Sequence, residues 1–97
     1  MLYYTQNREE YNQVHELLEF LYIKQSNGDY GATTSEIFHN IGLENSDFRR
    51  ITTKLKIRKM LESKRTKNNR SIYNIPEEMI TKVRDEIYKE NVTWDFK

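Results

Sequence analysis

Basic side chains are concentrated in one stretch of this chain, where they could bind a polyanion by electrostatic attraction. Between Ser46 and Ile72 lie ten lysines and arginines but only two acidic residues, so the stretch carries a formal charge of +8. The remaining residues hold six basic and thirteen acidic side chains, which give −7 and leave the whole chain at +1. This uneven distribution predicts one face that attracts a polyanion. The ten basic residues are Arg49, Arg50, Lys54, Lys56, Arg58, Lys59, Lys64, Arg65, Lys67 and Arg70.

Residues for other kinds of chemistry are scarce. The chain has no cysteine, so it can form neither disulfides nor cysteine-based metal sites. His15 and His39 are the only histidines, and the pairing of His15 with Glu19 four residues later is more typical of a helix surface than of a metal site. No serine-centred nucleophile motif occurs, and three glycines are too few for a phosphate-binding loop. We therefore expect no enzyme activity and no metal or other cofactor, and no small-molecule ligand is evident.

The length of the chain predicts a single domain over residues 1–97 with one small core. No apolar run approaches the roughly 18 residues that a membrane helix needs, and the polar N-terminus does not resemble a signal peptide. We therefore expect no membrane span and a cytoplasmic, intracellular location, with which the absence of cysteine agrees.

Apolar spacing and capping residues predict the elements that precede the basic stretch. Tyr11, Val14 and Leu18 recur at intervals of three and four residues, as on one face of a helix. A capping box at Thr33 and Glu36 starts a second helix, and Gly42 has the position of a left-handed residue that ends it. The sequence thus predicts a helix over 8–25, a short extended segment over 30–33 and a helix over 34–40.

Within the basic stretch, the sequence predicts a third helix over 46–58. Ser46 can cap its first turn, and an apolar set at i, i+4 and i+7 should face inward while the basic side chains face outward. Further along the chain, Pro76 fits the first position of a last helix over 76–90, which leaves a tail over 91–97. The inward-facing set is Phe48, Thr52 and Leu55.

A β-hairpin is predicted between the third and the last helix. Its strands, 61–65 and 70–75, flank a three-residue loop over 67–69 in which Asn69 takes the left-handed conformation. This loop places the large side chains on one face, whereas a two-residue loop would pair Glu62 with Ile75 and bury less apolar surface. The expected pairs are Leu61 with Ile75 and Ser63 with Tyr73.

The order of these elements resembles the winged helix-turn-helix family over about residues 8–75. TTSEIFHNIGL at 33–43 is similar to the second helix and turn of that family. SDFRRITTKLKIRKMLESKR at 46–65 is similar to its recognition helix and first wing strand, and RSIYNI at 70–75 is similar to its returning strand. Lys59 departs from the pattern, because many members have glycine before the wing strand. The resemblance implies a mainly α fold with a small β-hairpin, namely a three-helix core with a wing, followed here by an extra C-terminal helix.

The same resemblance implies sequence-specific binding to double-stranded DNA, as in a transcriptional regulator. Helix 46–58 would enter the major groove, and the wing over 61–75 would contact the backbone or an adjacent groove. Because arginine can pair bidentately with guanine, the expected base-reading residues are Arg49, Arg50 and Thr53. Phosphate contacts are expected from Thr34, Ser35, Lys54, Lys56, Lys64, Arg65, Lys67 and Arg70. The residues at the wing tip that could hydrogen-bond in the minor groove are Asn68 and Asn69.

Two other functions are compatible with the same elements. A winged helix can serve as a protein–protein interaction module that binds or blocks an intracellular partner, and it can bind an origin in replication or partition. The last helix, 76–90, often mediates dimerisation in the family, and we expect a homodimer. Aromatic residues at the two chain ends would either cap the core or contribute to a dimer surface. They are Tyr3, Tyr4, Trp94 and Phe96.

Overall fold

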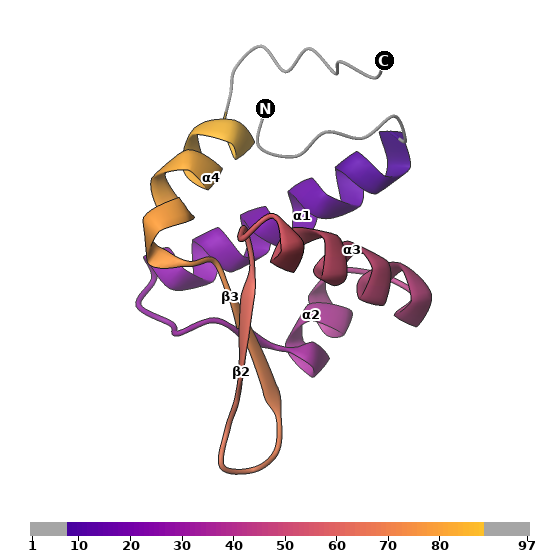
Figure 1. The fold of residues 1–97 in the computed structure, drawn as a ribbon, viewed down its shortest axis with the longest axis vertical. Coiled ribbons are helices and arrows are strands. Elements are labelled where there is room, and N and C mark those ends of the chain that lie inside the picture. The colour runs from indigo at the N-terminus through magenta and orange to yellow at the C-terminus, as the bar shows by residue number, and fades with distance from the viewer. Residues whose placement is uncertain (1–7, 89–97) are drawn as a thin grey trace.

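The computed structural model describes residues 8–88 as a mainly helical structure with a small antiparallel sheet (Figure 1). This confirms the expected mainly α class with a β-hairpin. Every helix within 8–88 is either too short or too polar to cross a lipid bilayer. The elements in chain order are α1 (Arg8–Ser26), β1 (Ala32–Thr33), α2 (Thr34–Asn40), α3 (Asn45–Ile57), β2 (Glu62–Arg65), β3 (Ser71–Asn74), the 3-10 turn η1 (Glu77–Met79) and α4 (Ile80–Ile87).

The longest helix, α1, supplies one continuous side of the core. Val14, Leu17 and Leu21 recur at helical spacing and are buried, because this spacing places them on one face of the helix. Helix α4 packs against α1 (Figure 1). Its Val83 and Ile87 are buried in the core. The other core side chains come from the remaining elements and the loops that follow them. They include Ile37, Ile41, Leu43, Phe48, Ile51, Leu55, Met60, Leu61 and Ile75.

The predicted capping box at the start of α2 is present. The Glu36 N–H donates to Thr33 Oγ1, and the Thr33 N–H donates to Glu36 Oε1 at 3.0 Å. Lys24 on α1 pairs with the same carboxylate. The Lys24 hydrogen bond, with the help of Thr33, lowers the pKa of Glu36 below its ordinary value. The expected left-handed conformation of Gly42 is wrong, because α2 ends instead on an extended Ile41 whose N–H donates to Ile37.

Helix α3 begins one residue earlier than predicted, and its cap is not Ser46. The N-cap residue is Glu44, with extended backbone and no side-chain capping hydrogen bond, so Ser46 lies inside the first turn. The helix ends at Ile57, and Lys59 then adopts the left-handed conformation with φ 59°. Lys59 thus has the backbone conformation that glycine adopts most easily.

The hairpin has the predicted register and loop. Ser63 pairs with Tyr73, and the Thr66 N–H donates to the Arg70 carbonyl at 2.8 Å, which leaves a three-residue loop. Asn69 is left-handed with φ 60°, as expected for this loop type. Burial of one hairpin face was therefore enough to predict the register.

Strand β3 is the central strand of the sheet and is held on both sides. It pairs with β2 along the hairpin and with β1 through Ala32 and Thr33. Immediately beyond β3, the Gln25 side chain donates to the Ile75 carbonyl at 3.1 Å and accepts from its N–H at 2.8 Å. The base of the hairpin is thereby joined to the end of α1, while its tip extends beyond the helices (Figure 1).

The last helix starts later than predicted. Pro76 is extended (ψ 142°) and precedes the 3-10 turn η1, so its expected position as the first residue of the helix is wrong. A proline ring leaves φ near its helical value but does not fix ψ, so Pro76 can be extended and the helix can begin after it. The predicted end at Glu90 and the tail over 91–97 lie outside the described residues.

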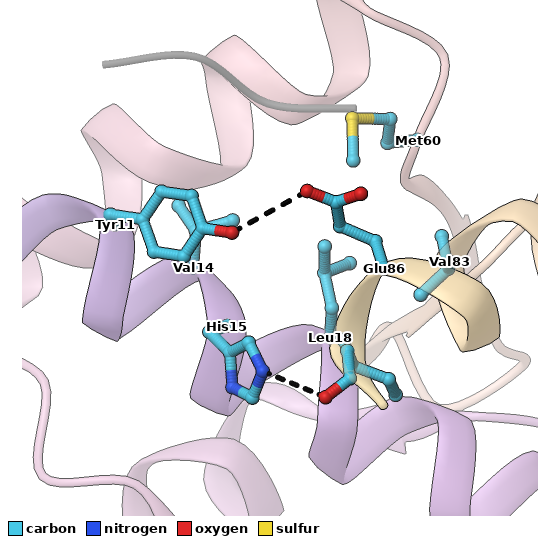
Figure 2. Close-up of a pocket in the computed structure, with 8 residues that line it drawn as sticks. Tyr11, Val14, His15, Leu18, Met60, Val83 and Glu86 are labelled. Atoms are coloured by element: carbon cyan, nitrogen blue, oxygen red, sulfur yellow. Dashed lines mark hydrogen bonds between the residues drawn. The ribbon is translucent and has the colours of Figure 1, made fainter. Parts of the chain in front are cut away.

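A hollow of about 20 Å³, the size of one water molecule, lies between α1 and α4 (Figure 2). Tyr11 donates to Glu86 Oε1 at 3.5 Å, and His15 Nε2 lies 3.1 Å from the Ile87 carbonyl (Figure 2). Burial raises the pKa of the Tyr11 hydroxyl, and the Glu86 charge raises it further. His15 therefore contributes to the contact between α1 and α4.

Candidate nucleic-acid interface

Helix α3 presents its polar residues in two neighbouring stripes because its apolar side is fixed in the core. Phe48, Ile51, Thr52 and Leu55 are buried, so the residues between them must face outward. We name the two stripes by what they adjoin. The wing-side stripe is Arg49, Thr53 and Lys56, spaced i, i+4 and i+7. The α1-side stripe is Arg50 and Lys54, spaced i and i+4.

The wing-side stripe is exposed and adjoins the sheet. The Lys56 ammonium lies 5.3 Å from the ring centroid of Tyr73 on β3, a cation–π contact that orients the lysine next to the hairpin. The Tyr73 ring packs edge-on against Phe48 of α3, with ring centroids 5.3 Å apart. Arg49 and Thr53 are exposed, and neither side chain has an ion pair or hydrogen bond within residues 8–88. These side chains are therefore available to a ligand.

The α1-side stripe is paired within the protein. Glu10 of α1 is only 4% exposed, and its Oε1 accepts from Arg50 Nε at 3.2 Å and from Lys54 Nζ at 2.9 Å. Arg50 also pairs with Asp47 through Nη2 at 3.1 Å. Two of the residues expected to contact DNA thus already contact carboxylates, and they lie on the side of α3 that faces α1.

A polar groove of about 370 Å³ separates the start of α2 from the wing. Thr34 and Ser35 line one wall, and Asn69 and Arg70 line the other. Hydroxyls opposite a guanidinium can all donate to phosphate oxygens. The structure thereby brings together four predicted site residues that are far apart in the sequence.

The wing carries its cations on both faces and at its tip. Arg65 donates to Asn69 Oδ1 at 2.8 Å, and Lys67 and Asn68 are exposed in the loop. Lys64 has the opposite orientation, because side chains alternate along a strand. It donates to the Tyr30 hydroxyl at 2.6 Å, and this hydrogen bond raises the pKa of Lys64. Lys64 is thus on the hairpin face that points away from Tyr73.

Glu10 was not predicted from the sequence as part of the site. It is nevertheless in register with Val14, Leu17 and Leu21 on the buried face of α1. A carboxylate on an apolar stripe needs a cation, and α3 supplies two. The position of Glu10 on the apolar face of the helix could therefore have predicted a cation partner. Tyr30 and Tyr73 were also missed as partners of Lys64 and Lys56, and their sequence positions gave no such indication.

The structure defines a small, mainly helical domain in which a three-stranded antiparallel sheet adjoins a basic helix. No protein-family model, curated protein or solved structure matches the chain.

Proposed function

We propose that this protein is a winged helix-turn-helix protein that binds double-stranded DNA in a sequence-specific manner, as a transcriptional regulator does. The observation that carries the proposal is the exposed wing-side stripe of α3 next to a hairpin with its own cations. The groove between α2 and the wing supports it further, because its walls combine hydroxyls with an arginine. An origin-binding protein would use the same surface.

The proposed mechanism is non-catalytic. Exposed cations of α3 and the wing attract the DNA backbone, and phosphate contacts fix the orientation of the domain. Arg49 and Thr53 then read base edges in the major groove, where arginine can pair bidentately with guanine. Thr34, Ser35 and Arg70 contact a phosphate in the groove between α2 and the wing. Arg50 was also expected to read bases, but its contacts with Glu10 and Asp47 favour Arg49 for this role.

The test is a fluorescence-anisotropy titration of the full chain with random-sequence duplex DNA at several salt concentrations. If about six side chains neutralise phosphates, a plot of log K against log salt should have a slope of roughly −5. Arg49→Ala should weaken binding, because this cation has no partner within residues 8–88. Arg84→Ala is the matched control, since Arg84 is an exposed arginine on α4 that pairs with Asp85.

A flat salt dependence would contradict the proposal, as would equal losses from Arg49→Ala and Arg84→Ala. No binding at low salt by the folded protein would instead favour the protein–protein interaction module. The aromatic residues considered for such a surface, Tyr3, Tyr4, Trp94 and Phe96, lie outside the described residues.

A further inference from the structure

Glu10 is buried at the contact between α1 and the basic helix. It shares its helix face with Val14, Leu17 and Leu21, and its side chain is 4% exposed. The two cations that meet its Oε1 remain in contact with solvent, since Arg50 is 46% and Lys54 is 41% exposed. The carboxylate is therefore the buried member of this cluster, and the cations are its accessible members.

This asymmetry makes the contacts difficult to exchange for DNA phosphates. Moving Arg50 and Lys54 to the DNA would take two cations away from a buried carboxylate, which is unfavourable. A phosphate contact at the protein surface is screened by salt. The free energy it contributes is therefore much smaller than the cost of removing the two cations from Glu10. Asp47 adds a second acceptor for Arg50 at 3.1 Å and reinforces the same orientation.

We propose that Glu10 is a positioning residue that holds Arg50 and Lys54 away from DNA and so restricts contact to the wing-side stripe. This inference rests on the proposed function. With both cations held, α3 offers the duplex one charged stripe beside the wing instead of two. The affinity of the protein for non-specific DNA is therefore lower than it would be with Arg50 and Lys54 released, because each released cation could contact phosphates of any sequence.

Glu10→Gln tests the inference, because it removes the charge while keeping nearly the same volume. Its affinity for random-sequence duplex DNA should rise about tenfold at low salt. The salt slope should become steeper by roughly one to two, since each additional phosphate contact contributes about 0.9 and Asp47 still pairs with Arg50 in this variant. Glu9→Gln is the matched control, because Glu9 is the exposed neighbour and its loss changes the net charge equally. That variant should show at most a small change in affinity and no change in slope.

Two further variants assign the effect to the pairing. Glu10→Asp keeps the charge but withdraws the carboxylate by one methylene, so it should give an intermediate gain. Adding Arg50→Ala and Lys54→Ala to Glu10→Gln should remove the gain. A thermal melt followed by circular dichroism establishes that each variant is folded before it is titrated.

The outcomes separate the inference from the proposed function. If the wild type binds DNA and Glu10→Gln binds with the same affinity and slope, the inference is wrong and the proposed function stands. A gain that persists without Arg50 and Lys54 also overturns the inference. If neither the wild type nor the folded Glu10→Gln variant binds DNA, the proposed function fails and the inference fails with it.

Discussion

Lys59 and Asn69 are the two described residues other than glycine with a left-handed backbone, at φ 59° and 60°. Asparagine tolerates this conformation better than most residues, so Asn69 could be predicted from its type and its position in the loop. A lysine gives no such signal. The family resemblance indicated only that glycine is common at this point. The structure supplies the reason, because Lys59 takes the left-handed position of a Schellman cap, in which the Met60 N–H donates to the Leu55 carbonyl at 2.9 Å and the Lys59 N–H to the Lys56 carbonyl at 3.0 Å.

Lys59→Gly should stabilise the protein, because it relieves the left-handed strain at a residue that is exposed. The gain is reduced by the greater freedom of glycine in the unfolded chain, which leaves about 0.5–1 kcal/mol in the free energy of unfolding. Thermal unfolding should show a midpoint raised by a few degrees. Lys59→Ala removes the same charge but keeps the strain, so it should give no comparable increase. Equal midpoints for the two variants would contradict this explanation.

At the scale of elements, the sheet shows which features can be inferred from local sequence. The hairpin register followed from the burial of one face, and the start of α2 followed from its capping box. The pairing of β1 with β3 could not be inferred, because a strand of two residues carries no periodic signal and its partner lies about forty residues away. The predicted start of α3 at Ser46 was one residue too late. Its N-cap residue, Glu44, makes no side-chain capping hydrogen bond, so the sequence carries no capping signal there.

Gly31 and Gly42 allow a matched test of the contact between β1 and β3. A Cβ atom on Gly31 would lie 2.3 Å from the Tyr73 carbonyl oxygen, whereas one on Gly42 would meet nothing within 4 Å. Gly31→Ala should therefore lower the free energy of unfolding by about 1–3 kcal/mol through steric overlap. Gly42→Ala should leave it nearly unchanged or slightly raised. Urea denaturation of both variants measures the difference, and similar midpoints would show that β1 can move away without cost.

At the scale of the whole molecule, the sequence predicted that cations would gather near α3 and the hairpin but not which of them are available. Charge can be counted along a chain, whereas the partner of each side chain depends on tertiary contacts. Glu10, which is distant in sequence, pairs with Arg50 and Lys54. Tyr30, also distant in sequence, accepts a hydrogen bond from Lys64. The single-domain organisation and the base-reading roles stay predictions.

The contact between α4 and α1 bears on the expected homodimer. Val83 and Ile87 of α4 are buried against α1 of the same chain, so the apolar face of α4 is not free to join a second copy. We therefore expect weak association, with a mass in sedimentation equilibrium that rises with concentration from 11.8 kDa toward twice that value. A constant mass of one chain at all concentrations, with and without DNA, would contradict the homodimer.

The hairpin is attached to the rest of the protein mainly at its base. Its base is clamped by β1 on one side and by the Gln25 side chain just beyond its end, whereas residues 66–70 extend beyond these attachments. The hairpin is thus a cantilever, attached to the rest of the protein at its base, with a tip that projects away from the helices (Figure 1). A ligand that contacts the tip could therefore shift residues 66–70 without breaking the pairing of β3 with β1, and the entropic cost of fixing their positions would be confined to these few residues.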